Sequence, residues 1–290
     1  MEFYEDLLAV LVLYKLKLSD SMSFISLTTS LKSNNIKVDL LVYDNFPQYN
    51  NNEKLTGYPN WNITYYPDEN NSGVSKAYNT AASLAIKKNK KWLLLLDQDT
   101  NFPVQTINAY IDAIKSFGNE KLFVPVMHTV NGDIISPGYL KFARGFYSKK
   151  IKRDFYSKNV KPGLNNLKDY STINCGMCID LVAFNKNKGY NELIKLDFSD
   201  HDFIRRFKKD IPNFVVLNLN VEHFLSTITK NSFNSDKVRF KYYLDGAAFF
   251  SQSFIDSFFF NIRLLLRAVK LSNTHKKIFF LKSAIQHILK

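Results

Sequence analysis

Two carboxylates lie two positions apart directly after an uninterrupted apolar segment of the chain. Residues 92–96 read Trp-Leu-Leu-Leu-Leu, and Asp97 and Asp99 follow with one glutamine between them. An apolar run without a polar face predicts a strand that is buried on both sides, as in a parallel sheet. Asn101 and Pro103 predict where this strand breaks, and ligands of open α/β sheets bind beyond the carboxyl ends of such strands.

Two acids at that place, with no basic residue between them, predict a hard oxygen site. Mg²⁺ and Mn²⁺ prefer carboxylate oxygens and commonly share their coordination with substrate phosphates. The alternative interpretation is that Asp97 and Asp99 only cap the strand and begin a turn. The long buried segment before them favours the metal site.

A second group of acids, Asp197, Asp200 and Asp202, lies within six residues and precedes a helical pattern that begins at Phe203. Since the N-terminus of a helix favours negative charge, capping is one interpretation. The other is a general base, in which a carboxylate beside a metal-phosphate site accepts a proton from an attacking hydroxyl while Arg206 orients it. Three acids exceed what capping requires, which favours the base.

The only two cysteines, Cys175 and Cys178, have the spacing of a redox pair or of half a zinc site. The sequence holds no second pair, and the nearest histidines, His201 and His223, lack zinc-site spacing. Neither redox chemistry nor a zinc site is favoured.

Composition and charge limit the class of protein. At 290 residues the chain can form one large α/β domain or a domain with an appendage, and its net charge of +13 suits polyanionic partners such as nucleic acid, anionic lipid or phosphorylated substrates. The apolar run at 7–14 follows acidic residues, unlike a secretion signal. No apolar run reaches the roughly 18 residues that span a membrane. We expect a cytoplasmic protein.

Strand and helix patterns alternate in the first half of the chain. Strands are predicted at residues 8–13, 38–43, 61–66 and 92–96, and helices at 19–33 and 75–88. Strands that are separated by helices imply right-handed βαβ units and a parallel sheet. The second strand ends at Asp44, so Asp44 and Asp97 should lie on the same rim of the sheet.

The second half is less regular. Strands are predicted at 122–127, 173–179 and 214–221, a helix at 203–208, and a basic, loop-rich segment at 129–169. Helices are expected from 239 to 290, where basic residues oppose an apolar stripe. The basic residues are Arg263, Arg267 and Lys270, and the stripe is Phe254, Ile255, Phe258, Phe259, Ile262, Leu265, Leu266 and Val269.

Several short motifs together resemble the inverting, nucleotide-sugar-dependent glycosyltransferases of family two, and within them the bacterial rhamnosyltransferase-like members. They follow the family's order over residues 7–230: Leu13-Tyr14, Tyr43-Asp44-Asn45, Asn71-Ser72-Gly73 with Ala77 and Asn79, Asp97-Gln98-Asp99-Thr100, Asn174-Cys175-Gly176, Tyr190-Asn191-Glu192, Asp200-x-Asp202-Phe203-x-x-Arg206 and His223. Lys15 and Ser199 depart from the family pattern. The rhamnosyltransferase-like Tyr-Tyr-x-x-Arg-Asn reads Tyr242-Tyr243-Leu244-Asp245-Gly246 here.

The resemblance implies a fold and roles for individual residues. The fold is an α/β GT-A fold: a mostly parallel, Rossmann-like nucleotide-binding sheet flanked by helices, with C-terminal helices. Tyr14 and Asp44 would hold the nucleotide base, Asp97 would face the ribose and diphosphate, and Asp200 would be the catalytic base. Asp99, with Asp97 and His223, would bind Mn²⁺ or Mg²⁺. The other expected substrate-binding residues are Asn71, Gly73, Lys76, Asn79, Gln98, Asn174, Asp202 and Arg206.

The predicted domain organisation follows the same comparison. Residues 1–235 form the catalytic domain, with a nucleotide-sugar-binding half at 1–117 and an acceptor-binding half at 118–235. Residues 236–290 form a basic amphipathic helical segment. This segment either packs on the catalytic domain or rests on the anionic inner face of the cell membrane.

The predicted activity is metal-dependent, inverting transfer of a sugar from a nucleotide-sugar donor to a glycan acceptor. The resemblance of the Asp-Gln-Asp form to that of the rhamnosyltransferase-like members implies rhamnose from dTDP-rhamnose. It also implies an acceptor that is a hydroxyl of a growing, lipid-linked bacterial surface polysaccharide such as O-antigen or capsule. A haloacid-dehalogenase-type phosphatase is one alternative, but its Asp-x-Asp motif normally lies on the first strand. A nucleic-acid-binding protein is the other, and no helix-turn-helix, RNP or zinc pattern supports a nucleic-acid partner.

Overall fold

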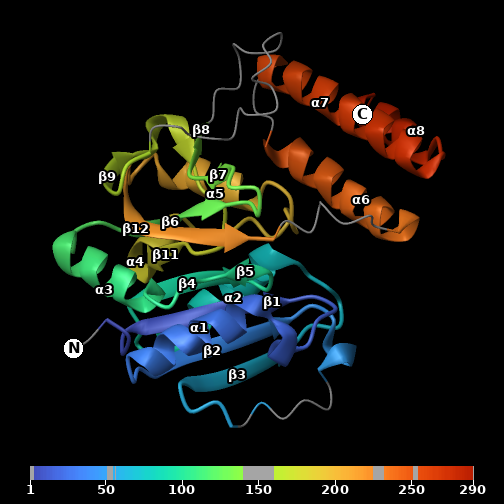
Figure 1. The fold of residues 1–290 in the computed structure, drawn as a ribbon. Helices are drawn as coiled ribbons and strands as arrows, with labels where there is room; N and C mark the ends of the chain where they lie inside the picture. The colour runs from blue at the N-terminus through green and yellow to red at the C-terminus, as the bar shows by residue number, and fades with distance from the viewer. Residues whose placement is uncertain are drawn as a thin grey trace.

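The computed structural model describes residues 3–50, 55, 57–139, 160–224, 232–250 and 254–289. One large mixed sheet has helices on both faces, and three further helices from the end of the chain lie together beside it (Figure 1). The fold class is the α/β arrangement that the sequence predicts, with C-terminal helices present. The basic, loop-rich segment predicted at 129–169 lies partly outside the described residues.

The strands have these bounds: β1 Leu7–Leu13, β2 Val38–Asp44, β3 Trp61–Pro67, β4 Trp92–Asp97, β5 Thr100–Asn101, β6 Leu122–His128, β7 Ile134–Ser136, β8 Gly138–Tyr139, β9 Gly163–Asn166, β10 Tyr170–Ser171, β11 Cys178–Asp180 and β12 Asn213–His223. The α-helices are α1 Met22–Ser33, α2 Val74–Lys87, α3 Thr106–Ser116, α4 Leu181–Lys186, α5 Ser199–Phe207, α6 Phe233–Phe250, α7 Phe254–His275 and α8 Phe279–Ile288. Short 3₁₀ helices cover Leu18–Asp20, Pro47–Tyr49 and Leu167–Asp169.

The main sheet has the strand order β3-β2-β1-β4-β11-β6-β12-β5. The first four strands are parallel, as their alternation with helices predicts. Strand β11 runs antiparallel to both of its neighbours, β4 and β6. The register pairs Leu13 with Asp44 and Val12 with Asp97, so these two acids do end on one rim of the sheet.

Strand β4 is buried on both faces, which explains its continuous apolar sequence. Leu94 and Leu96 belong to the core beneath α1 and α3, where Phe24 and Leu27 also pack. Leu93 and Leu95 belong to the opposite core, beneath α2, α4 and α5. Two hydrophobic layers therefore hold the strand that carries Asp97 at its end.

The prediction of a strand at 173–179 is largely wrong, because in this segment the strand β11 covers only Cys178–Asp180. Gly176 has φ +78, and a Cβ atom there would lie 2.7 Å from the Pro125 ring. The amide of Met177 donates to the oxygen of Asn174 at 3.0 Å, closing a turn. Gly176 therefore interrupts the strand, because its backbone has positive φ and lies too close to Pro125 for a side chain.

The C-terminal helices have a small core of their own, made by Phe240, Leu264, Ala268, Phe280 and Ala284. Three members of the predicted apolar stripe on α7 face solvent instead: Phe258 is 55% exposed, Leu266 58% and Val269 44%. Helix α7 is apolar on two faces, and only one of them packs. Of the stripe, the side chains of Phe254, Ile255 and Phe259 lie outside the described residues.

The basic side of α7 is also different from the prediction. Arg267 does not join an outer basic face: its guanidinium stacks 4.0 Å from the centre of the Tyr243 ring and lies 3.9 Å from Asp197. Among the described helices, none is both long and apolar enough to cross a membrane.

Candidate active site

A pairing between two distant strands brings the expected metal ligands together. Strand β5 pairs antiparallel with the end of β12, which places Thr100 opposite His223. Asp97, Asp99 and His223 each offer a ligand atom, and these atoms lie within 4.8 Å of one another. His223 Nδ1 lies 3.7 Å from Asp99 Oδ1 and 2.7 Å from Thr100 Oγ1. Strand β4 ends at Asp97, before the predicted break at Asn101, and Asn101 itself lies in the short separate strand β5.

The turn that carries the two acids is held from both sides. The Ser23 hydroxyl hydrogen-bonds the main-chain oxygen of Asp97 and accepts from the Thr100 amide at 3.1 Å. Cys175 Sγ accepts from the Asp97 amide at 3.4 Å and lies 3.0 Å from Thr100 Oγ1. Both cysteines are buried, and burial raises the pKa of the Cys175 thiol well above its usual value. Cys175 therefore supports the turn.

The chemistry of the three ligands fits a divalent cation. Burial raises the pKa of Asp97 to about 6, opposed by the nearby His223 and reinforced by Asp99. Burial also raises the pKa of Asp99. Two crowded, partly desolvated carboxylates beside an imidazole are a set of ligands that a divalent cation would stabilise.

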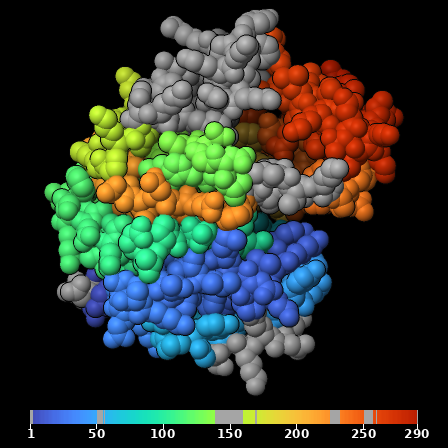
Figure 2. Space-filling view, in the orientation of Figure 1, coloured from blue at the N-terminus to red at the C-terminus, as the bar shows by residue number. Residues whose placement is uncertain are grey.

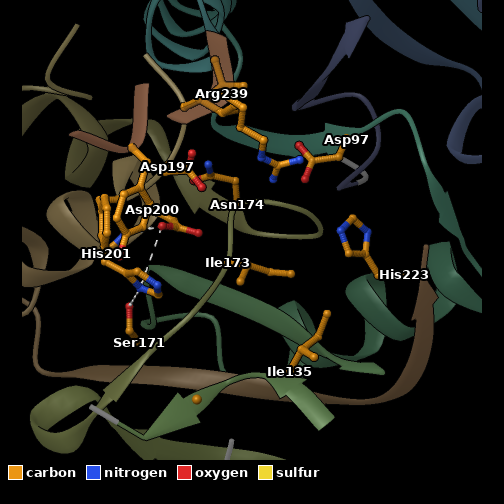
Figure 3. A pocket seen from close by; sticks show the side chains of 15 residues that line it. Asp97, Ile135, Ser171, Ile173, Asn174, Asp197, Asp200, His201, His223 and Arg239 are labelled. Atoms are coloured by element: carbon orange, nitrogen blue, oxygen red, sulfur yellow. Dashed lines mark hydrogen bonds and ion pairs between the residues drawn. The ribbon is translucent and has the colours of Figure 1, made fainter. Parts of the chain in front are cut away.

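The candidate base lies across the same cavity. A cavity of about 380 Å³ is lined by Asp97 and His223 on one side and by Asp200 and His201 on the other (Figure 3). Asp200 is in the first turn of α5, where its Oδ1 accepts the His201 amide at 2.7 Å. Ser171 Oγ lies 2.7 Å from His201 Nδ1. The carboxylate is thus oriented with one oxygen engaged.

The expectation that Arg206 orients Asp200 is wrong. Arg206 pairs with Asp202, at 2.9 Å, and donates to the main-chain oxygens of Asn187 and Gly189 at 2.6 and 2.8 Å. Residues four apart share a face of a helix, whereas residues six apart do not. Asp202 and Arg206 therefore fix α5 to the preceding turn, and Asp202 is buried.

Three of the expected substrate residues at the start of α2 connect it to the segment 189–195 in this structure. A Cβ atom at Gly73, which has φ +93, would collide with the main-chain oxygen of Lys195. The Asn79 amide bonds both the N–H and the C=O of Tyr190, at 2.8 and 3.0 Å. Lys76 pairs with Glu192 at 3.1 Å on the surface. These contacts join α2, in the predicted nucleotide-sugar-binding half, to residues of the predicted acceptor-binding half.

The expected base-binding residues differ in their access to a ligand. Tyr14 is 41% exposed at the end of β1. Asp44 has no exposed surface, and its carboxylate accepts from the Phe46 amide, Asn50 Nδ2 and the Tyr65 hydroxyl at 2.9, 2.6 and 2.8 Å. The Asp44 carboxylate therefore fixes the loop that contains Phe46 and Asn50. Of the two expected base-binding residues, Tyr14 is the one that a ligand can reach.

Two more of the expected residues are engaged by the protein. The Gln98 side chain accepts from the Tyr14 amide at 2.8 Å and donates to the Tyr14 oxygen at 3.3 Å, which fixes the end of β1. Asn174 lines the cavity while it accepts from the Tyr190 hydroxyl at 2.7 Å and donates to Ser199 at 3.1 Å. Asn71 does not line this cavity, and its Nδ2 lies 3.5 Å from the Tyr242 hydroxyl.

Sequence reasoning missed the part of the cavity wall that comes from α6. Arg239 and Tyr243 line the cavity together with Asp197. Burial raises the pKa of Asp197, while the charges of Arg267 and Arg239 oppose that shift. Asp197 Oδ2 is buried without a hydrogen-bond partner among the described residues. The Tyr242-Tyr243 motif was the signal that could have pointed to this helix.

A parallel half-sheet with Asp97 and Asp99 at the end of its strand β4, across a cavity from the Asp200 carboxylate, is the arrangement of a GT-A fold. The chain belongs to glycosyl transferase family 2, because the model of that family matches residues 26–177, just over half of the chain. No curated protein matches the chain significantly in sequence.

Solved structures of S. aureus TarS are similar in fold. TarS 1–349 in complex with UDP-GlcNAc has a TM-score of 0.54 at 15% identity, covering 99% of this chain and 82% of that chain. The complex with UDP has a TM-score of 0.51 at 14% identity, covering 90% and 71%. A longer TarS structure has a TM-score of 0.51 at 13% identity, and this chain spans 54% of its length. At this identity the likeness supports the fold alone.

Proposed function

We propose that this glycosyltransferase moves a sugar from a nucleoside-diphosphate sugar to an acceptor hydroxyl, with a divalent cation and with inversion at the anomeric carbon. The observation that carries the proposal is one cavity with Asp97 and His223 on one wall and Asp200 on the other. The TarS structures of similar fold hold UDP and UDP-GlcNAc, which supports a nucleotide-sugar donor.

The residues divide the chemistry between two walls. A cation bound by Asp97, Asp99 and His223 would neutralise the diphosphate leaving group. The Tyr78 hydroxyl donates to Asp97 Oδ1 at 3.2 Å and fixes the orientation of that carboxylate. On the other wall, Asp200 accepts the proton of the acceptor hydroxyl with the oxygen that the His201 amide leaves open. One base and one displacement invert the anomeric configuration, with no carboxylate nucleophile.

The metal site has a direct test. Asp99→Ala removes one ligand from a half-buried turn whose main chain is held at Thr100 by the Ser23 hydroxyl, so the fold should persist. We expect the variant to lose Mn²⁺ binding by calorimetry, to lose transfer, and to keep the wild-type unfolding midpoint. Full transfer by the wild-type protein in EDTA would contradict the proposal.

The donor is proposed to be dTDP-rhamnose, on the sequence resemblance. Tyr14 at the exposed end of β1 would contact the pyrimidine base. A thermal-shift comparison of dTDP-rhamnose, UDP-GlcNAc and GDP-mannose, each with Mn²⁺, decides between donors. A larger shift with UDP-GlcNAc than with dTDP-rhamnose would replace rhamnose as the proposed sugar.

The acceptor is proposed to be lipid-linked, with the C-terminal helices resting on an anionic membrane surface. Apolar side chains of α7 and of the residues that flank α8 are exposed, as are lysines of both helices, and these helices form part of the surface seen in Figure 2. These residues are Phe258, Leu266, Ile278, Leu289, Lys270 and Lys282. Each basic residue near such a surface contributes about 1 kcal/mol, and apolar side chains add area, so binding would be reversible and sensitive to salt.

Liposome flotation tests the membrane contact. Phe258→Ser with Leu266→Ser should reduce binding to phosphatidylglycerol vesicles, whereas Leu164→Ser, a similarly exposed residue on β9, should not. High salt should weaken the wild-type interaction. Equal binding to neutral vesicles, or none to anionic ones, would leave only the packing role for these helices.

A further inference from the structure

One face of α6 is turned toward the catalytic cavity. Arg239, Tyr242, Tyr243 and Gly246 are spaced i, i+3, i+4 and i+7, which places them on one side of the helix. The exposed Lys241 lies on another side. Each of these four residues either contacts another element or lines the cavity.

The C-terminal end of this face packs on the turn that precedes the base. A Cβ atom at Gly246 would collide with the main-chain oxygen of Asp197 and lie 2.9 Å from the Phe198 ring. The Tyr243 and Phe198 rings pack with centroids 5.0 Å apart. Arg267 of α7 lies over Tyr243 and beside Asp197. Helix α6 is therefore anchored against residues 197–198, two positions from Asp200.

The N-terminal end of the face lies over the expected donor site. Tyr242 has its hydroxyl 3.5 Å from Asn71 Nδ2, and burial together with the nearby Tyr14 raises its pKa. Arg239 reaches from α6 toward the Asp97 side of the cavity (Figure 3). Burial raises the pKa of Asp99 and of Asp197, and the nearby charge of Arg239 opposes both shifts, so this guanidinium lies near both walls.

The charges that line the cavity explain what a cation on α6 would do. The carboxylates of Asp97, Asp197 and Asp200 line it, and among the described lining residues Arg239 is the only lysine or arginine. A diphosphate entering this space meets three carboxylates, so it requires positive charge from more than one direction. A guanidinium offers paired N–H groups that match two phosphate oxygens at once.

We propose that α6 forms the third wall of the donor site, where Arg239 binds the diphosphate and Tyr242 lies against the nucleoside beside Tyr14. The inference rests on the proposed function and adds to it a binding residue from outside residues 1–235. The C-terminal segment thereby has a role at the active site that is separate from any contact with a membrane.

Calorimetry with Mn²⁺ and with UDP, dTDP or GDP tests the inference. For the diphosphate that the wild-type protein binds most tightly, Arg239→Met should weaken binding by about 10- to 100-fold, the range expected when one charge-assisted pair is lost. Affinity for the parent nucleoside, measured by ligand-observed NMR at millimolar concentration, should change less than about 2-fold, since a nucleoside carries no phosphate. Lys241→Met on the same helix is the matched control and should bind as the wild type does.

The outcomes separate the two proposals. Wild-type diphosphate affinity in Arg239→Met, or an equal loss of diphosphate and nucleoside binding, would overturn the role of Arg239. If Arg239→Met does not fold, Arg239→Lys keeps the charge without the paired donors and should show a smaller loss for the diphosphate alone. Absence of binding of all three diphosphates to the wild-type protein with Mn²⁺ would instead contradict the proposed function.

Discussion

Replacing Asp200 by asparagine removes a proton acceptor while keeping the size and shape of the side chain. The asparagine oxygen can still accept the His201 amide that now binds Asp200 Oδ1 at 2.7 Å. The side chain is only 17% exposed and begins α5, so the local structure should persist. Loss of a general base slows a reaction by about 10²- to 10⁴-fold. This corresponds to about 2.7–5.5 kcal/mol in the activation free energy.

The assay measures release of the nucleoside diphosphate during transfer, together with donor affinity. We expect kcat to fall over that range in Asp200→Asn while the donor Kd changes less than about 2-fold, because the proposed metal ligands lie on the other wall of the cavity. Asp210→Asn, at an exposed acid paired with Lys186 at 3.6 Å, is the control and should be fully active. Near-normal turnover in Asp200→Asn with an inactive Asp197→Asn would place the base at Asp197 and refute the assignment.

Two further predictions concern stability. Asp202→Ala should lower the free energy of unfolding by about 2 kcal/mol or more, because it leaves Arg205 and Arg206 without the buried carboxylate that they bind at 2.7 and 2.9 Å; a chemical denaturation midpoint equal to the wild type would contradict this. Asp197 has a raised pKa, so it favours the folded state at low pH, and that contribution is lost as pH rises from about 4 through the folded pKa. Asp197→Asn should therefore remove this part of the pH dependence in urea denaturation, and an unchanged slope would show that Asp197 ionises normally.

The first half of the sheet is predictable because its determinants are local. Each strand is an apolar run between helical patterns, and parallel strands present their carboxyl ends on one rim. Asp44, Asp97 and Asp99 could therefore be placed from the sequence. The pairing of Asp202 with Arg206 was also accessible, since it follows from helical spacing alone.

The other features depend on contacts between distant parts of the chain. His223 meets Asp99 because β5 and β12 pair across more than a hundred residues, which no local pattern specifies. Residues of α6 reach the cavity because Gly246 lets this helix approach Asp197 closely. An isolated glycine in a helical pattern does not indicate which residue will pack against it. Helical spacing predicts that Arg267 lies on the outer, basic face of its helix, but its guanidinium stacks on the Tyr243 ring.

The stereochemistry of transfer tests the central claim most directly, because it depends on a single base across the cavity from the metal ligands. The wild-type protein is incubated with Mn²⁺, the donor selected by thermal shift and a lipid-linked acceptor, and the anomeric configuration of the product is read by NMR. We predict release of the nucleoside diphosphate and a product whose anomeric configuration is opposite to that of the donor. A product that retains the donor configuration would contradict the single displacement assisted by Asp200.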